Sequence, residues 1–304
     1  MTNEFYKLGT LIKRHIKLYF KDKVTFFVSL ITPLILVVLF LTFLQGVYEN
    51  SLLSMMPEGI NVSQSAINAF TGGWLFSSII AVSSVTVAFC CNMMVLDKVS
   101  KSVQDFQIAP VRTSTLNTSY FIANFITTLI ICLIVFVISM LYLTVVGFYL
   151  SLLDVLMLLV STFISVLFGC LLASVIGLFI SSQGAQTGVS VLISSMYGFI
   201  CGAYMPISQF GTGIQTLVSL LPGTYGTVLF RQFYMRGVVN HLQNTHHLPD
   251  EFADTLLSSF DGKFTAFGTT VPTWAMFVIM IGTTTLLFGL YLLISKLGKN
   301  KKVR

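Results

Sequence analysis

Charged residues are scarce in this chain of 304 residues. Asp, Glu, Lys and Arg together make up 9% of the sequence, apolar types make up 55%, and the mean hydropathy is +0.87. A soluble domain of this length would need about 25% charged residues to cover its core. Because the shortage extends along nearly the whole chain, the sequence excludes a large soluble domain and predicts an integral membrane protein.

Ionisable side chains are missing from the long apolar stretches. Ion-coupled transporters and pumps normally place such groups along their path, and acid–base or metal catalysis at membrane depth would need them too. The chain also lacks the Gly-x-x-x-x-Gly-Lys-Ser/Thr loop that holds nucleotide phosphates, and its histidines fit no familiar zinc spacing. We therefore expect no catalytic, cofactor or metal site in this chain, and any energy must come from a partner.

Six charge-free windows of at least about 18 residues predict membrane-spanning helices. They predict an all-α integral membrane protein with six transmembrane helices, in a single transmembrane domain over residues 1–304. The N-terminus lacks a signal-peptide pattern, so we expect the first span to be retained. All five cysteines fall within the windows, so we expect no disulfides. The windows lie at 24–46, 71–96, 116–147, 155–182, 188–206 and 271–295.

Basic residues are distributed unevenly between the loops. An even number of spans places both termini on one side, and that side carries every Lys and Arg except Arg231, Arg236 and Lys263. Cytoplasmic loops are enriched in Lys and Arg, so we expect both termini and the loop 97–115 to be cytoplasmic. The net charge of +6 is then a topology signal. Nucleic-acid binding would need a basic face beside a folded domain, and we expect no nucleic-acid partner.

Residues 4–22 have the periodicity of an amphipathic helix. A helix of this kind lies in the membrane surface, with basic side chains at the lipid headgroups and apolar side chains at the acyl boundary. The alternative is a basic leader that only fixes the orientation of the chain. The apolar face consists of Phe5, Leu8, Ile12, Ile16, Tyr19 and Phe20, and the basic face of Lys7, Arg14, Lys17 and Lys21.

The loop 97–115 is the longest connection on the cytoplasmic side. Val99, Val103 and Phe106 fall on one face of a short predicted helix, Asp105 lies beside them, and Pro110 ends it. We expect this element to contact a soluble partner, with Phe106 as the anchor. Packing of Phe106 against the third span or the lipid surface is the alternative.

Residues 207–270 form a long exterior segment. Its semi-apolar part, up to about residue 236, is interrupted by glycines and prolines and predicts a re-entrant helical segment between spans five and six. The rest, 237–270, is predicted to be a polar exterior loop.

Four residues in or near the spans are candidates for a substrate path. Asn124 could line a path or bond between helices. Tyr197, Tyr204 and Tyr225 could contribute rings near the outer end of a path, or they could belong to the interfacial aromatic belt. The sequence leaves these alternatives open.

The order of these features resembles the permease subunit of type-2 ATP-binding-cassette (ABC) exporters. The resemblance covers essentially the whole chain and rests on the helix 4–22, the stretch 98–111 before the third span, and three motifs near the fifth span. These motifs are the stretch from Gly198 to Ile207 with Pro206, Leu-Pro-x-x-Tyr ending at Tyr225, and Leu-x-Arg ending at Arg231. Two features depart from the common pattern: Lys101 stands where glycine is frequent, and the outer loop 237–270 is long.

This resemblance implies an assembly. Two permeases, either two copies of this chain or this chain and a similar one, would pair in the bacterial cytoplasmic membrane. Each would dock a cytosolic ABC ATPase that binds ATP and magnesium, with 98–110 as the coupling helix. The implied function is export of an amphipathic substrate, such as a drug, a lipid-like metabolite or an antimicrobial peptide. Export of a lipid-linked polysaccharide and a membrane sensor or scaffold that moves no substrate are the alternatives.

Overall fold

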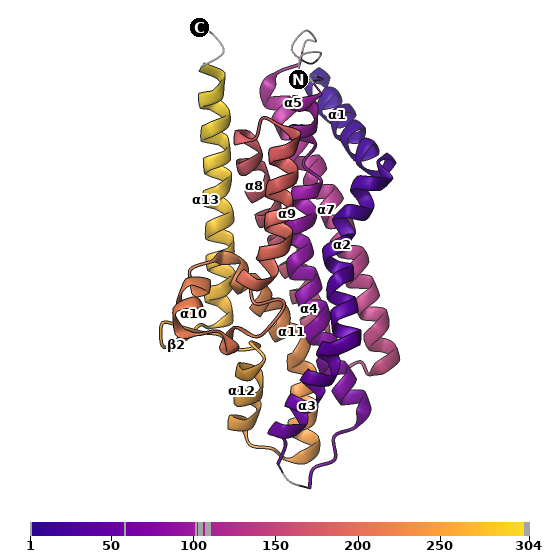
Figure 1. Ribbon diagram of the computed structural model, residues 1–304, viewed down its shortest axis with the longest axis vertical. Helices are drawn as coiled ribbons and strands as arrows, with labels where there is room; N and C mark the ends of the chain where they lie inside the picture. Colours follow the sequence, from indigo (N-terminus) through magenta and orange to yellow (C-terminus); the bar gives the residue numbers. More distant parts are fainter. Residues whose placement is uncertain (1, 58, 101, 103–105, 107–110, 301–304) are drawn as a thin grey trace.

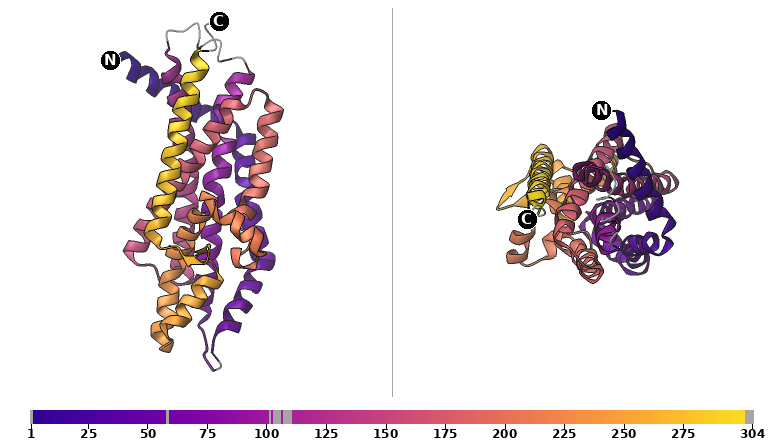
Figure 2. Two further views of the ribbon diagram at one scale, coloured as in Figure 1. Left: turned by 90° about the vertical axis from the view of Figure 1, so that its left-hand side faces the viewer. Right: turned by 90° about the horizontal axis from the view of Figure 1, so that it is seen from above.

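The computed structural model describes residues 2–57, 59–100, 102, 106 and 111–300. Long helices run side by side along the molecule, with the N-terminal helix α1 (Thr2–Lys21), helix α5 (Met93–Val99) and both chain ends at one end (Figure 1). Helix α3 (Gln45–Met55) and helix α12 (Asp250–Ser259) lie at the other end. Figure 2 shows α1 lying across its end of the bundle, at a steep angle to the long helices. The helical fold predicted from the sequence is confirmed.

The first membrane span is part of a long helical rod. Helix α2 (Lys23–Leu39) continues through a π-helical turn, η1 (Phe40–Leu44), directly into α3. Asp22 caps the rod, because its carboxylate accepts hydrogen bonds from the backbone N–H and the hydroxyl of Thr25 at 3.2 and 2.7 Å. Among the described residues, the helical stretch Pro33–Met55 is long and apolar enough to cross a membrane, and it overlaps the predicted window 24–46.

Helix α4 (Gln64–Cys90) is the centre of the bundle, because every residue from Ala69 to Phe89 is buried. Glycine, serine and alanine are frequent in this helix, and such small residues let neighbouring helices approach closely. For example, a Cβ added to Gly169 of α8 (Leu152–Phe179) would collide with the backbone of Ser84. Helix α4 therefore contacts α2, α7 (Thr113–Val146), α8, α9 (Gln183–Ile200) and α11 (Pro222–His246).

Five helical stretches among the described residues are long and apolar enough to cross a bilayer. They correspond to five of the six predicted windows, and helix α13 (Thr273–Asn300) provides the last of them. The stretches are Pro33–Met55, Gln64–Val99, Thr113–Val146, Leu152–Phe179 and Thr273–Ser295.

Helix α9 falls in the remaining window but differs from the prediction 188–206. It begins at Gln183, ends at Ile200 and is not among the five apolar stretches. It ends because Gly202 takes a positive φ of 72°, while the N–H groups of Gly202 and Ala203 bond to the carbonyls of Phe199 and Gly198. This is a glycine-terminated Schellman motif. The six-span count stays a prediction.

The segment 207–270 is mostly helical. It contains a short 3₁₀ turn, η2 (Ile207–Gln209), helix α10 (Thr212–Ser219), helices α11 and α12, and a hairpin of β1 (Thr265–Ala266) and β2 (Thr269–Thr270). The predicted polar loop 237–270 is therefore wrong. Helix α11 continues to His246 because Val238, Val239 and Leu242 pack into the core, and α12 buries Leu256 and Leu257 beside it.

Candidate functional site

Helix α1 is fixed to the bundle by one narrow face. Leu11, His15 and Tyr19, spaced four residues apart, are all buried where α1 packs against its neighbours. Phe5 and Phe20 stay exposed, as a membrane-surface helix requires. The lipid contact predicted for Phe5 and Phe20 stays a prediction, whereas Tyr19 is buried against protein, contrary to the prediction that it faces the acyl boundary.

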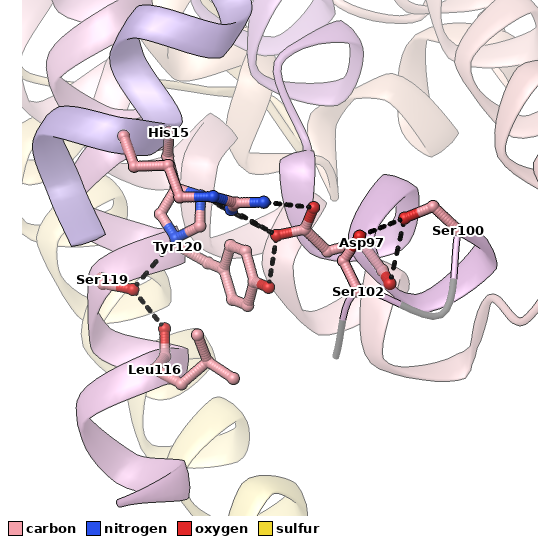
Figure 3. Close-up of polar contacts among 8 residues, drawn as sticks. His15, Asp97, Ser100, Ser102, Leu116, Ser119 and Tyr120 are labelled. Carbon is pink, nitrogen blue, oxygen red and sulfur yellow. Dashed lines mark hydrogen bonds and ion pairs between the residues drawn. The ribbon is translucent and has the colours of Figure 1, made fainter. Parts of the chain in front are cut away.

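Asp97, near the end of α5, collects hydrogen bonds from two other helices (Figure 3). The Arg14 guanidinium of α1 donates to both carboxylate oxygens, at 2.8 Å to Oδ2 and 3.3 Å to Oδ1. The Tyr120 hydroxyl of α7 donates to Oδ2 at 2.7 Å. Such a two-pronged arginine contact is strong and directional, and it raises the pKa of Arg14. Arg14 thus pairs with protein, contrary to the prediction that it faces lipid headgroups.

His15 is neutral in this arrangement. Its Nδ1 lies 3.1 Å from an Arg14 nitrogen, which can only donate, so Nδ1 must accept. The proton therefore sits on Nε2, which donates to the Ser119 hydroxyl at 3.2 Å, and Ser119 in turn donates to the carbonyl of Leu116 at 2.7 Å (Figure 3). Burial lowers the pKa of His15 to about 4, and the nearby Asp97 carboxylate only partly opposes this. We call Arg14, His15, Asp97, Ser119 and Tyr120 the junction.

Helix α5 is also fixed on its other side. The Lys98 ammonium donates to the carbonyls of Gly177 and Leu178 at 3.0 and 3.3 Å, at the C-terminal end of α8. A cation is favoured there by the unpaired carbonyls and the helix dipole. The Asn92 amide donates to the carbonyl of Ala173 at 2.9 Å. Helix α5 is therefore held by α1, α7 and α8 together.

The predicted coupling residues are only partly described. Val99 ends α5, so the stretch 98–110 is not one unbroken helix, contrary to the prediction. Phe106 is helical and half-buried beside Leu11 and Leu116, and the Arg14 guanidinium lies 5.0 Å from its ring centre. Phe106 therefore packs next to the junction. Val103, Asp105 and Pro110 lie outside the described residues, and the coupling role stays a prediction.

A groove of 850 Å³ lies beside α5, between α2 and α9. Its α2 wall is apolar and its α9 wall is largely hydroxyl and amide, while Asp22 is the one charged residue among the described residues that line it. This arrangement suits a molecule with one apolar and one polar side. The α2 wall includes Val24, Val28, Ile31, Ile35 and Leu39, the α9 wall includes Gln183, Gln186, Thr187, Ser190 and Ser194, and α5 adds Met93, Leu96 and Val99.

The candidate path residues are found in different places. Tyr204 lines the groove, where its ring meets Phe199 edge-on at 4.8 Å. Asn124 is buried and donates to the carbonyl of Ala88 at 3.0 Å, which is a bond between α7 and α4. Tyr225 donates to the carbonyl of Ser219 at 2.7 Å, and Tyr197 packs against the core beside Gly223. The structure thus brings one of these four residues to the groove.

A second ion pair, between Arg231 and Asp261, lies away from the junction. The sequence did not predict this pair. Arg231 of α11 is fully buried, 2.7 Å from the carboxylate of Asp261, and its guanidinium lies 4.5 Å from the ring of Trp74. It also donates to Ser78 at 3.3 Å and to the carbonyl of Gly202. Asp261 accepts from the N–H of Ile207 at 2.6 Å. We call Arg231 and Asp261 the outer pair; the signal for it was an arginine directly after the charge-free stretch 206–230.

Comparison with known protein families shows the family of this chain. No curated protein sequence matches the chain. The family model of the ABC-2 type transporter matches residues 6–235, which include most of α1, the junction, the groove and Arg231. Because the match extends over most of the chain, the chain belongs to the ABC-2 type transporter family and is a transmembrane permease subunit of an ABC transporter.

Proposed function

We propose that this permease exports an amphipathic substrate from a bacterial cell, driven by ATP hydrolysis in a separate cytosolic ATPase. The observation that carries the proposal is the groove, because its apolar α2 wall and polar α9 wall complement the two sides of such a molecule. The partner would bind ATP and magnesium, since this chain has no phosphate-binding loop. Both termini would be cytoplasmic, α9 would complete six spans, and α10 with the start of α11 would form the re-entrant segment.

Helix α5 supports a route from the ATPase to the groove. It leads directly into the proposed coupling segment 98–110, and its residues Leu96 and Val99 line the groove. Asp97 ties it to α1 and α7, and Lys98 ties it to α8. A push on α5 would therefore move several helices together and change the shape of the groove, as a rigid two-state element must.

A second permease copy would complete the groove. The exposed apolar residues of α2 and α9 that border it include Val28, Ile31, Val191 and Phe199. An open apolar surface of this kind favours a protein or lipid neighbour over water. Pairing across this face would place two grooves against each other and make one enclosed path.

The test is transport in liposomes with and without the ATPase that co-purifies with the chain. The permease alone should neither hydrolyse ATP nor accumulate a lipophilic fluorescent dye against its gradient, while the complex should do both. Dye accumulation driven by a proton gradient without nucleotide would contradict the proposal. ATP hydrolysis without movement of the dye, but with movement of a lipid-linked polysaccharide, would favour the alternative substrate, and movement of neither would favour a sensor.

The coupling contact can be tested in the same system. Phe106→Ala should weaken ATPase association by about 2 kcal/mol, roughly 30-fold, if the ring is an anchor in the partner. The matched control is Phe5→Ala, because Phe5 is an exposed ring on α1 outside the segment 98–110. Unchanged association and coupling in a correctly inserted Phe106→Ala protein would show that the ring only packs beside Arg14 and Leu11.

A further inference from the structure

Two short exterior elements project sideways from the helical bundle. Helix α10 and the β1–β2 hairpin lie at the level where α13 begins (Figure 1), and both stand out from the bundle in the view along its long axis (Figure 2). The hairpin turns through Phe267 and Gly268, which both take positive φ values, 51° and 81°. Two such residues make the tight turn preferred in hairpins, so the phenylalanine ring is presented at the tip.

The projecting elements carry bulky apolar side chains that the protein leaves uncovered. Ile214 and Leu217 of α10 are 56% and 61% exposed, and Leu220 just after it is 67% exposed. The opposite side of α10 is buried at Val218. Phe267 at the hairpin tip is 66% exposed, and Trp274 in the first turn of α13 is 69% exposed. An amphipathic helix, an aromatic loop tip and a tryptophan thus lie exposed in one part of the molecule.

The same elements contain no charge, whereas the neighbouring exterior helix does. Residues 206–230 and 264–295 lack Asp, Glu, Lys and Arg altogether. Helix α12 is different, because Glu251 and Asp254 are exposed on it and Asp254 pairs with Lys263. Helix α12 thus exposes charged side chains, as a water-facing surface does, and the projecting elements expose none.

We propose that Ile214, Leu217, Leu220, Phe267 and Trp274 form an anchor in the outer leaflet, at the boundary between headgroups and acyl chains. Tryptophan and amphipathic helices favour this boundary. The anchor continues into the exposed apolar surface of α13, which includes Val278 and Ile281. This continuity favours lipid over a second permease copy. The proposal rests on the exterior placement of 207–270 given under the proposed function.

The anchor has a mechanical consequence for the segment that follows α9. It fixes the depth of α10, and α10 is joined to the end of α9 through residues 201–211. The outer end of the groove, at Phe199 and Tyr204, is therefore held at a constant depth in the bilayer. The outer ends of α3, α11 and α12 then form a head outside the membrane.

Tryptophan fluorescence can test the anchor because the chain has two tryptophans in opposite surroundings. Trp74 is fully buried and Trp274 is exposed. In liposomes with lipids brominated near the headgroup end of the acyl chain, Trp274 emission should be quenched, and more strongly than by lipids brominated near the chain end. Trp274→Phe should abolish this quenching, because only Trp74 remains. Adding Phe267→Trp to the Trp274→Phe protein should restore quenching with the same depth preference.

The matched control is Asn244→Trp in the Trp274→Phe protein, since Asn244 is exposed near the far end of α11. This tryptophan should not be quenched by either lipid. Quenching of Trp274 no stronger than at position 244 would overturn the proposal. A blue-shifted Trp274 emission that brominated lipids do not reduce would also overturn it, because a second protein copy would then cover the site. The experiment needs neither ATPase nor substrate, so it can fail while the transport function stands.

Discussion

The junction and the outer pair use the same chemistry in different surroundings. Each joins an arginine to an aspartate, but the Arg14 side chain is 33% exposed, whereas the Arg231 side chain is fully buried. Burial raises the pKa of the Asp261 carboxyl, and the Arg231 guanidinium and the Ile207 amide oppose that rise. A fully buried pair is costly to break because each charge depends wholly on the other, whereas water reaches the Arg14 side of the junction pair although Asp97 is buried. The outer pair therefore suits a fixed part of the molecule, and the junction suits a part that moves.

Breaking the outer pair should have the largest effect. Asp261→Asn keeps the shape of the side chain, and asparagine tolerates the positive φ of 55° at this position. The variant leaves Arg231 buried without a counter-charge, so it should lower the free energy of unfolding by about 3–5 kcal/mol. A thiol-reactive dye that reports exposure of the largely buried cysteines on heating in detergent would measure this.

The control for Asp261→Asn is Asp254→Asn, because Asp254 is an exposed partner of Lys263. It should change stability by less than about 1 kcal/mol. Equal effects of the two substitutions would show that burial does not distinguish the outer pair from a surface pair.

The same substitution at the junction should have a smaller effect on stability and a larger effect on coupling. Asp97→Asn removes the charge that Arg14 and Tyr120 bind, at a cost of about 1.5–3 kcal/mol. Because part of this contact faces water, the helices should stay folded while α5 loosens from α1. The measurement is the number of dye molecules moved per ATP hydrolysed, which should fall, together with the unfolding temperature.

The control at the junction is Glu4→Gln, since Glu4 bonds to Lys7 and Thr115 near the exposed start of α1. It should leave the transport ratio unchanged. A normal ratio in Asp97→Asn would mean that the contact between α5 and α1 carries no motion.

The effect expected to be smallest near neutral pH is a pH dependence that comes from His15 of the junction. The pKa of His15 falls from its usual 6.5 to about 4 on folding, so the neutral form is favoured in the docked state. The docked state is most stable above pH 6.5, and its stability falls as the pH falls from 6.5 through 4. At pH 5 the loss of stability is about 2 kcal/mol. Spin labels on Gly9→Cys and Thr118→Cys, in a background without native cysteines, would report separation of α1 from α7.

His15→Gln separates this titration from other effects of acid. Asp97, Arg14 and Tyr120 also face His15, and Glu4 lies near the other end of α1. The glutamine variant retains these groups but has no imidazole, so its label distance should not change between pH 6.5 and 5. A change of equal size in both proteins would assign the dependence to another group.

The sequence predicted the fold well where one pattern decided it. Long runs without charge located α7, α8 and α13 to within a few residues. The second half of α11 and helix α12 were missed because their polar exposed faces hid the buried residues Val238, Leu242 and Leu256. The end of α9 was missed because a single residue, Gly202, sets it. The backbone conformation of a single glycine, and a helix with one polar and one apolar face, are hard to recognise in a sequence that is apolar almost throughout.

The candidate site was less predictable than the fold, because its contacts join distant parts of the chain. Arg14 and Asp97 are 83 residues apart, and nothing in the periodicity of α1 shows which of its sides meets protein. Helical pattern separates polar from apolar faces, but both lipid and protein accept an apolar face. Tyr204 reached the groove and Asn124 did not, for the same reason: position relative to other helices decides which polar residue lines a path.

The π-helical turn η1 divides the first span into two α-helical halves whose relative rotation about the helix axis depends on that turn. A π turn holds one residue more than an α turn, so the parts of the rod before and after Phe40–Leu44 are out of phase with a plain α-helix by about 100°. The α2 half of the rod turns Ile31 and Ile35 to the groove, and the α3 half turns Tyr48 onto Trp74, with ring centres 4.3 Å apart. Trp74 also covers the Arg231 guanidinium. Relaxation of that single turn would rotate one half of the span against the other, so torsion along the helix axis would link the groove to the outer pair.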